Sequence, residues 1–389
     1  MSPRAESVRP ASAPPTAPGA ASAPRTAPDA APASRAGQPN HPDGRAEDVG
    51  HGPVLTLDGL DVTVSGGAHA VRGVSFTVGR GEAVGLVGES GSGKSLTCRS
   101  ALGVLPAGCR VTGGRITLGA SADGPDAELT ALTRRQWNSI RGRRVGAVFQ
   151  DPASYLNPSL TVGRQLAEQL RVARGLSRAE AHARAVELFA DVGLHRPGEV
   201  YHQYPYELSG GMLQRVLIAI AVSCSPELLI ADEATTALDV VVQAEILELL
   251  QRLRAEQGLA LLLVTHDLAV VAESCDRILV MYAGEIVEDG PTAEVLAAPA
   301  HPYTEALLRV ASIGDWGRRE LGVIPGRPPE TGAELPGCRF ADRCAHAVAE
   351  CAEEPVPLRT PAPGRRARCL RVPAQPGTAP ASVPEGVPA

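Results

Sequence analysis

Short apolar runs alternate with stretches of helical periodicity along the chain from Val54 onward. Three of these runs predict buried strands that end in glycine or polar residues: EAVGLVG (82–88), LLIAD (228–232) and LLLVTH (261–266). Strands that alternate with helices are typical of an α/β domain with a largely parallel sheet. Because ligands bind outside the carboxyl ends of such strands, we expect these three ends to converge on one site.

Helical periodicity fills the stretches between the predicted strands. Residues 166–194 predict helix alone, with SRAE (177–180) as a capping box, so a mostly helical insert precedes the second strand. Residues 238–258 predict a crossover helix that ends at Gly258. Its apolar positions repeat at helical spacing: Ile246, Leu249, Leu250 and Leu253. Further on, ILVMYAGEIVEDG (278–290) predicts two short strands.

The composition argues against a nucleic-acid-binding or membrane-spanning protein. The 389 residues include 43 acidic and 37 basic side chains, a net charge of −6 and 3% aromatic residues, whereas a nucleic-acid groove needs clustered basic and aromatic side chains. No apolar run reaches the roughly 18 residues that span a bilayer, and the N-terminus lacks a signal-peptide core. We therefore expect no nucleic-acid partner and a protein kept in the cytosol. Residues 1–52 and 373–389 predict disordered tails.

The first predicted strand leads into GESGSGKS (88–95), which fits the phosphate-loop pattern GxxxxGK[ST]. Its glycines let the backbone N–H groups face the β-phosphate, Lys94 then reaches the β/γ oxygens, and the Ser95 hydroxyl binds Mg²⁺. The alternative is a plain Gly-rich turn, which the strand before it and the apolar helix after it disfavour. The residues expected to contact the nucleotide are Gly88, Glu89, Ser90, Gly91, Ser92, Gly93, Lys94, Ser95 and Leu96.

Polar residues at the other strand ends supply the remaining chemistry. Asp232 is expected to hold Mg²⁺ through its water, and Glu233 to polarise the attacking water. His266 is expected to bond the γ-phosphate, and Gln150 to reach Mg²⁺ or water. Each residue alone has a simpler interpretation, as a solvated helix start or a polar strand end. The order and spacing of all of them, together with Lys94, favour a catalytic nucleotide site.

A second glycine-rich helix start lies about a hundred residues later, in ELSGGMLQRV (207–216). Unpaired N–H groups and the positive end of the helix dipole make such a start an anion site. The chain therefore has two helix starts suited to binding phosphate, whereas one nucleotide site accounts for only the first of them.

Together these motifs resemble the ATP-binding subunit of an ABC transporter. Six motifs of that family occur here in the same order. GESGSGKS matches the phosphate loop, Gln150 the glutamine loop and LSGGM (208–212) the signature. LLIADE (228–233) matches the magnesium-acid strand, ALD (237–239) the D-loop and His266 the histidine switch. The match covers about residues 54–302. The resemblance implies an α/β P-loop NTPase ABC cassette, with a RecA-like mixed sheet core and a helical subdomain, that uses ATP and Mg²⁺.

The resemblance also explains the second helix start. In such cassettes two subunits dock head to tail, which implies that Ser209, Gly210 and Gly211 cap the γ-phosphate on the partner's phosphate loop. Asp239 would then line the seam between the subunits. Two ATP molecules hold the dimer closed, and hydrolysis at Glu233 releases it.

Four further segments resemble the dipeptide/oligopeptide importer branch, and its D-type ATPase subunit in particular: residues 150–165, 206–222, 235–240 and 301–308. This implies an F-type ATPase partner, with a homodimer as the alternative. It also implies two transmembrane permeases, a substrate-binding protein and a peripheral place on the cytoplasmic face of the membrane. A nickel chelate or another small solute remains open as the cargo. Two other classes of protein fit the sequence less well. A soluble ABC ATPase that acts on DNA or ribosomes usually has long coiled-coil inserts or two cassettes per chain, and this sequence shows neither. A simple P-loop kinase or GTPase would not use the LSGGM motif.

Two positions depart from the family pattern. The aromatic residue that stacks on adenine is expected near Ser65, in VTVSGGAHAV (62–71), where no aromatic residue stands. The expected consequence is weaker nucleotide affinity or base selectivity. Ala234 also replaces the usual proline after the catalytic glutamate.

The eight cysteines form two groups. Cys98, Cys109, Cys224 and Cys275 occur singly and are expected to be plain buried thiols. Cys338, Cys344, Cys351 and Cys369 are separated by 6, 7 and 18 positions, unlike a zinc ribbon. They are either four free thiols or ligands of a [4Fe–4S] cluster or Zn²⁺, since a unit with few apolar residues gains stability from a metal. We favour the cluster, which the resemblance to the importer's C-terminal extension also implies.

The predicted boundaries follow from these segments. An ABC ATP-binding domain is expected at 53–300, with its helical subdomain at about 151–225. The C-terminal extension with the four cysteines is expected at 301–372.

Overall fold

The computed structural model describes residues 52–121, 124–234, 238–311 and 323–373. Apart from their border residues Gly52 and Pro373, the tails predicted at 1–52 and 373–389 lie outside these ranges.

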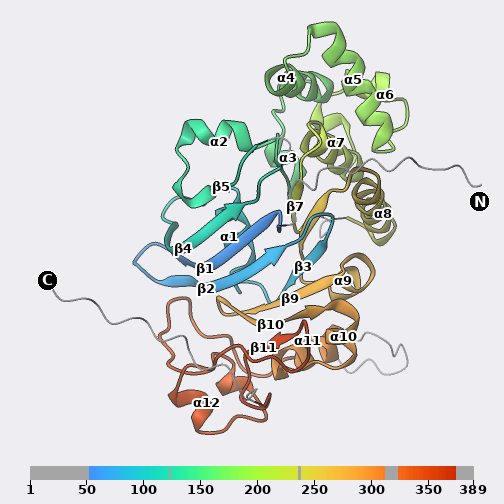
Figure 1. Ribbon diagram of the computed structural model, residues 1–389. Helices are drawn as coiled ribbons and strands as arrows, with labels where there is room; N and C mark the ends of the chain where they lie inside the picture. The colour runs from blue at the N-terminus through green and yellow to red at the C-terminus, as the bar shows by residue number, and fades with distance from the viewer. Residues whose placement is uncertain (1–51, 122–123, 235–237, 312–322, 374–389) are drawn as a thin grey trace, which may run out of the picture. The chain divides into compact units, whose positions relative to one another are not determined.

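Two β-sheets are present in the described residues (Figure 1). The first is antiparallel, with strand order β2-β1-β4-β5. Its strands are β1 (Leu55–Thr63), β2 (His69–Val78), β4 (Arg110–Leu118) and β5 (Ala127–Glu128). In β1, buried positions recur at about every second residue, as expected for a strand with one face on a core. The sequence analysis did not predict this separate sheet.

The second sheet has seven strands in the order β11-β10-β9-β3-β8-β7-β6. These are β3 (Ala83–Val87), β6 (Val145–Phe149), β7 (Leu228–Asp232), β8 (Ala260–Val264), β9 (Arg277–Tyr282), β10 (Glu285–Pro291) and β11 (Arg366–Ala367). The five strands from β9 to β6 run parallel, and β10 and β11 are antiparallel additions. Every residue of β3, β7 and β8 is buried, which explains their continuous apolar sequences. The predicted strands at 82–88, 228–232, 261–266 and 278–290 are all present.

Helices connect and cover these strands. They are α1 (Lys94–Ala101), α2 (Arg134–Ile140), α3 (Pro152–Tyr155), α4 (Val162–Arg174), α5 (Arg178–Asp191), α6 (Pro197–Val200), α7 (Gly210–Val222), α8 (Val240–Gln257), α9 (Leu268–Ser274), α10 (Thr292–Ala297), α11 (Pro302–Ala311) and α12 (Glu350–Glu353). The predicted capping box forms at the start of α5, between Ser177 and Glu180. Gly258 ends α8 in the left-handed conformation, with φ 65°.

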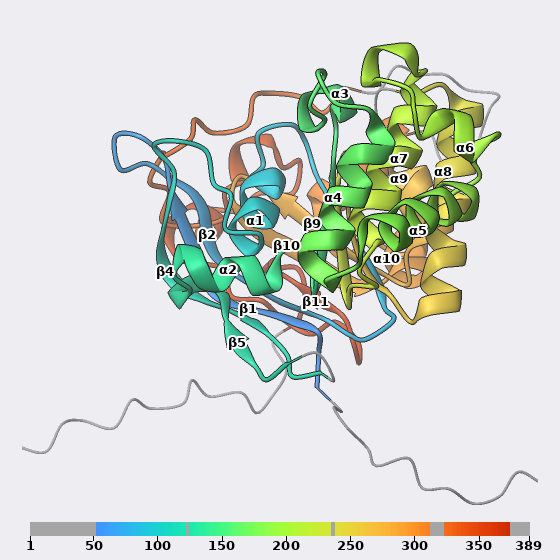
Figure 2. The same cartoon turned by 90° about the horizontal axis from the view of Figure 1, so that it is seen from above.

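Two hydrophobic cores lie on opposite faces of the seven-stranded sheet, because side chains alternate along each strand. Val84 and Leu86 of β3 belong to a core shared with α1 and the first sheet. Ala83 and Val87 face a core built with α4, α5, α7, α8 and α9. Figure 2 shows α1 beside the first sheet and α7, α8 and α9 grouped on the other side.

The C-terminal region, residues 323–373, packs against the second of these cores, the one that contains α4, α5, α7, α8 and α9. Ile324 and Phe340 are buried in the same core as the helices above. The ring of Phe340 lies 5.2 Å from that of Tyr282 of β9 and 5.4 Å from that of Tyr303 of α11. The sequence led us to expect that a unit with so few apolar residues could hardly fold on burial alone; its apolar side chains instead share the core of the preceding strands and helices.

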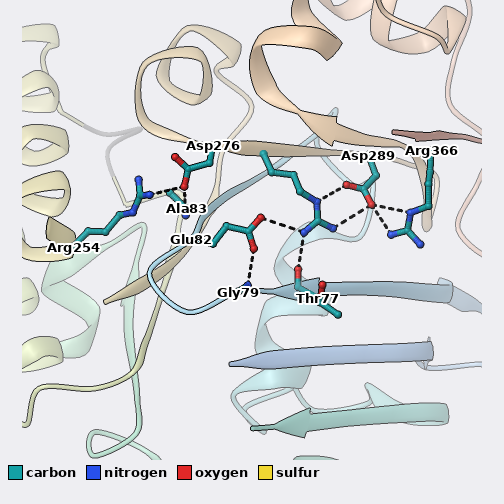
Figure 3. Close-up of polar contacts among 9 residues, drawn as sticks. Thr77, Gly79, Glu82, Ala83, Arg254, Asp276, Asp289 and Arg366 are labelled. Atoms are coloured by element: carbon teal, nitrogen blue, oxygen red, sulfur yellow. Dashed lines mark hydrogen bonds and ion pairs between the residues drawn. The ribbon is translucent and has the colours of Figure 1, made fainter. Parts of the chain in front are cut away.

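An ion-pair network pins this region to the edge of the seven-stranded sheet (Figure 3). Arg277 of β9 donates from Nε to Asp289 Oδ1 at 2.7 Å and pairs with Glu82 at 3.3 Å. Arg366 of β11 donates to the same Asp289 from Nε, at 3.0 Å. Nearby, Arg254 of α8 pairs with Asp276. The buried Asp289 of β10 thus accepts from both neighbouring strands: Arg277 links it to β9, and Arg366 links it to β11.

None of the helices in the described ranges is long and apolar enough to cross a membrane.

Candidate active site

The phosphate loop lies between the end of β3 and the first residue of α1. Gly88, Gly91 and Gly93 have φ values of 152°, 80° and 107°, a range that disfavours other residues. A Cβ on Gly88 would lie 2.1 Å from the carbonyl oxygen of Met281. Glycine is therefore required where the loop passes β9.

Lys94 is the first residue of α1 and is 4% exposed. Its Nζ donates to the carbonyl oxygens of Gly88, at 2.8 Å, and Glu89, at 3.0 Å. Burial lowers the pKa of Lys94, while the charges of Glu233 and Asp232 oppose that shift. The ammonium group is thus held inside the curl of the loop by neutral acceptors that a phosphate can replace.

Ser95 and Asp232 form a pair beside the loop. The Ser95 hydroxyl donates to Asp232 Oδ1 at 2.9 Å, and Arg99 Nε lies 3.9 Å from Oδ2. Burial raises the pKa of Asp232, because it disfavours the charged carboxylate. Hydroxyl and carboxylate oxygens suit Mg²⁺, which takes its remaining ligands from water and phosphate. The pair therefore fits a magnesium site that is completed by a bound nucleotide.

A pocket of about 380 Å³ opens over the loop and α1. Of the expected site residues it is lined by Ser90, Gly91, Gly93, Lys94, Ser95, Leu96 and Glu233. Glu233 has φ 51° and donates its N–H to the carbonyl oxygen of Val264 at 2.9 Å. A non-glycine residue in this conformation stores about 1–3 kcal/mol of strain, which is common at functional sites. Glu233 adopts this conformation where it lines the pocket.

The sheet register aligns the other expected residues along one edge. Phe149 is paired with Asp232, Asp232 with Val264, and Val264 with Leu86 of β3. Gln150 and His266 therefore follow strands that end beside Asp232 and the phosphate loop. Both side chains are exposed, and neither lines the pocket in the described part of the chain.

The signature residues form a different surface. Ser209 caps α7, and its hydroxyl accepts from the Met212 N–H at 3.4 Å. Asp239 caps α8 by accepting from the Val242 N–H at 3.0 Å. A Cβ on Gly211 would lie 2.6 Å from Val242 Cγ1, so the two helix starts are in close contact. Ser209, Gly210 and Asp239 are exposed and lie outside the pocket lining; Ala237 of the ALD motif is outside the described residues.

Three residues of the pocket wall were not predicted: Val64, Ala70 and Thr331. Val64 and Ala70 flank the turn that contains Ser65, and Thr331 comes from the C-terminal region. Among the described lining residues none is aromatic, so the expected loss of adenine stacking at Ser65 stays a prediction. No local pattern identifies Thr331, because only tertiary packing brings it to the pocket.

The four C-terminal cysteines converge on a separate cavity of about 260 Å³. Cys338, Cys344, Cys351 and Cys369 all line it, and none forms a disulfide. Burial raises the pKa of Cys338 to about 11. His301 also lines the cavity and is 1% exposed, and its Nε2 has no hydrogen-bond partner among the described residues.

No group of three or more His, Cys, Asp or Glu side chains in the described ranges is placed to hold a metal ion. Of the four single cysteines, Cys98 and Cys275 are buried as expected, whereas Cys109 and Cys224 are only half-buried.

A glycine-rich loop between a buried strand and a helix, with a buried lysine and a Ser–Asp pair beside it, defines a P-loop nucleotide-binding protein. The ABC transporter family model matches residues 71–236, and that of the oligopeptide/dipeptide transporter C-terminal region matches residues 287–351. The chain belongs to the ABC transporter family, and the predicted resemblance and fold class are confirmed. It is an ATP-hydrolysing ABC subunit that uses ATP and Mg²⁺.

Relatives and solved structures agree with this assignment. The chain is 46% identical to the oligopeptide transport ATP-binding protein AppD of Bacillus subtilis, over 77% of this chain and 90% of AppD. It is 47% identical to a putative peptide import ATP-binding protein of Brucella melitensis, over 82% of this chain and 97% of that protein. The ATP-binding cassette MJ0796, solved as a dimer bound to ADP and Pi, superposes with a TM-score of 0.54 at 28% identity, covering 61% of this chain and 98% of the cassette.

Proposed function

We propose that this chain powers the import of dipeptides or oligopeptides by an ABC importer. The observation that carries the proposal is that one chain joins an assembled phosphate-loop pocket to a region that matches the oligopeptide/dipeptide transporter C-terminal family. The relatives named above are peptide transport ATP-binding proteins, which supports the same cargo.

Within the pocket, Lys94 and the loop amides bind the phosphates, while Ser95 and Asp232 hold Mg²⁺. Glu233, at the pocket wall, polarises the attacking water, and His266 holds that water and the γ-phosphate in line. Gln150 follows β6 at the same edge and senses Mg²⁺ or water. The alignment of their strand ends supports these roles.

The starts of α7 and α8 serve a partner cassette. Ser209, Gly210 and Gly211 cap the γ-phosphate held by the partner, and Asp239 lies at the seam. Two large apolar side chains support an interface here: Val240 and Val241, which follow Asp239, are 82% and 68% exposed. We propose an F-type ATPase as the partner, with a second copy of this chain as the alternative.

The membrane contact is assigned to the loop after Gln150. This loop contains α3, and Tyr155 at its end is 49% exposed while its ring stacks on Phe149 at 4.5 Å. An exposed aromatic residue in the loop after Gln150 suits contact with the coupling helices of two permeases. A substrate-binding protein would deliver the cargo to these permeases. The chain is then peripheral, on the cytoplasmic face of the membrane.

Although no group of three or more His, Cys, Asp or Glu side chains in the described residues is placed to hold a single metal ion, we propose that the four thiols around this cavity hold a [4Fe–4S] cluster rather than one Zn²⁺ ion. The donor set matches a four-cysteine cluster, and the cavity has room for a group larger than a single ion. Cys338, Cys344, Cys351 and Cys369 would hold the cluster, which when bound would cross-link the segments of this region. Anaerobic purification with iron and sulfide analysis tests this proposal. We expect about four of each per chain, and Cys344→Ala to lose them; stoichiometric zinc without sulfide would contradict it.

The importer proposal is tested by affinity purification of this protein from its own membranes, followed by mass spectrometry. We expect two multi-span permeases and a second ATPase. Recovery of ribosomal or DNA-repair proteins without a permease would contradict transport. A binding protein selective for nickel chelates would change the cargo while leaving the importer intact.

A further inference from the structure

Glu89, the second residue of the phosphate loop, does not line the nucleotide pocket. Its carbonyl oxygen accepts from Lys94 Nζ at 3.0 Å, and its N–H donates to the Tyr303 hydroxyl at 2.8 Å. Its two carboxylate oxygens accept from the Arg343 guanidinium at 2.7 and 3.0 Å. The amide and the side chain of this loop residue are therefore both held by residues more than 200 positions further along the chain.

Arg343 has every donor engaged. Besides the two bonds to Glu89, its Nε donates to the Pro325 carbonyl at 2.9 Å, Nη1 to the Tyr282 hydroxyl at 3.2 Å and Nη2 to the Ile324 carbonyl at 3.2 Å. The side chain is 3% exposed. A guanidinium has five N–H groups in a fixed fork, so this site is built for arginine and for a paired carboxylate.

Tyr303 is equally fixed. It is fully buried, and its ring lies 4.5 Å from that of Tyr282. Burial raises the pKa of Tyr303, so the hydroxyl stays neutral and remains able to accept the amide hydrogen of Glu89.

We propose that Arg343 and Tyr303 are positioning residues for ATP binding, acting through Glu89. The loop binds phosphate with backbone N–H groups, so its affinity depends on how firmly the curl is held. A carboxylate next to a triphosphate also repels it, and Arg343 neutralises that charge where water cannot screen it fully. The C-terminal region is thereby part of the ATP site, although no atom of Arg343 lines the pocket.

The test measures the equilibrium affinity of the full-length protein for a fluorescent MgATP analogue, together with KM and kcat. We expect Arg343→Gln to weaken affinity and raise KM about tenfold with kcat within about twofold, the pattern of a lost binding interaction. Arg343→Lys keeps the charge but not the fork and should lose about threefold. Adding Glu89→Gln to Arg343→Gln removes the uncompensated charge but does not restore the anchor of the loop, so it should recover only part of the loss.

Arg366→Gln is the matched control, since Arg366 also pairs with a carboxylate, Asp289, away from the phosphate loop. We expect its affinity to equal that of the wild type. An Arg343→Gln affinity within twofold of wild type overturns the proposal, and so does a double variant with wild-type affinity, because charge alone would then account for the loss.

If the Arg343 variants do not unfold cooperatively in thermal melts, and so are not properly folded, Tyr303→Phe tests the proposal instead. Tyr303→Phe has nearly the same shape and removes only the acceptor of the Glu89 amide. We expect about threefold weaker ATP binding and a melting temperature lowered by a few degrees, since both changes have the size of one lost hydrogen bond. Unchanged affinity in this folded variant overturns the proposal.

Discussion

Helices α1 and α7 both begin at glycine-rich turns, yet their starts differ in side-chain capping and in burial. The start of α1 has no side-chain cap, and it is surrounded by the buried Lys94 and Asp232 of its own chain. The start of α7 is capped by Ser209 and lies exposed beside the start of α8. The comparison teaches that a glycine-rich helix start can occur in two settings: the start of α1 lies in a pocket of its own chain, whereas the capped start of α7 is exposed, as the proposed docking of a partner cassette requires.

The largest effect is expected at the pocket of α1. Glu233→Gln should leave ATP binding intact and slow turnover by roughly 10²–10⁴-fold, because it removes the general base. Phosphate release and nucleotide affinity, measured on the same preparation, check both parts. Near-normal turnover would remove Glu233 from this role.

The effect of a substitution at the start of α7 on ATPase activity should depend on which chain of the dimer carries it. Ser209→Arg should silence the ATP site of the partner by about 10²-fold or more, since a bulky cation replaces the cap at the phosphate. A dimer with Ser209→Arg on one chain and loss of the catalytic glutamate on the other should keep one working site, about half the activity. The same two changes on a single chain should stop both sites. Ser209→Asn, which preserves the helix cap, is the control. Equal activity in the two dimers would contradict the proposal that the start of α7 acts at the ATP site of the partner.

A smaller effect is expected from restoring the missing aromatic residue beside α1. Ser65→Tyr should raise ATP affinity by about 3- to 10-fold, the scale of one aromatic stacking contact. Ser65→Leu, which adds apolar area without a ring face, serves as the control. Competition titrations with ATP and GTP show whether base selectivity rises as well; no gain over the leucine variant would mean that the base binds elsewhere.

The smallest effect concerns stability without nucleotide. Because burial raises the pKa of Asp232, the folded protein binds its proton more tightly than the unfolded chain. The stability from the protonated form is present at low pH and is lost as the pH rises through the folded pKa. At pH 7 Asp232→Asn should therefore raise the melting temperature by about 1–3 °C, with a smaller gain as the pH falls. The exposed Asp58→Asn serves as the control, and a lower melting temperature at pH 7 would contradict this account.

Local signals account for what the sequence could predict. The strand before the phosphate loop, the capping box at Ser177 and the end of α8 at Gly258 each depend on residues within a few positions of one another. The antiparallel sheet was missed because only one face of its strands is buried, so polar residues interrupt the apolar runs that marked the strands of the larger sheet. Thr331 in the pocket wall and Arg343 on Glu89 were missed for another reason: 254 positions separate Arg343 from Glu89, and only the packed core joins them.

The strand order of the larger sheet has a consequence for synthesis of the chain. Its outer strand, β11, leaves the ribosome long after its neighbour β10. At about 5–20 residues per second, several seconds pass before Arg366 arrives to pair with Asp289. During that interval β10 presents an unpaired backbone edge, the kind of surface on which nascent chains aggregate. Backbone pairing at Glu288 and Asp289 of β10 therefore forms only after synthesis has passed Arg366 and Ala367.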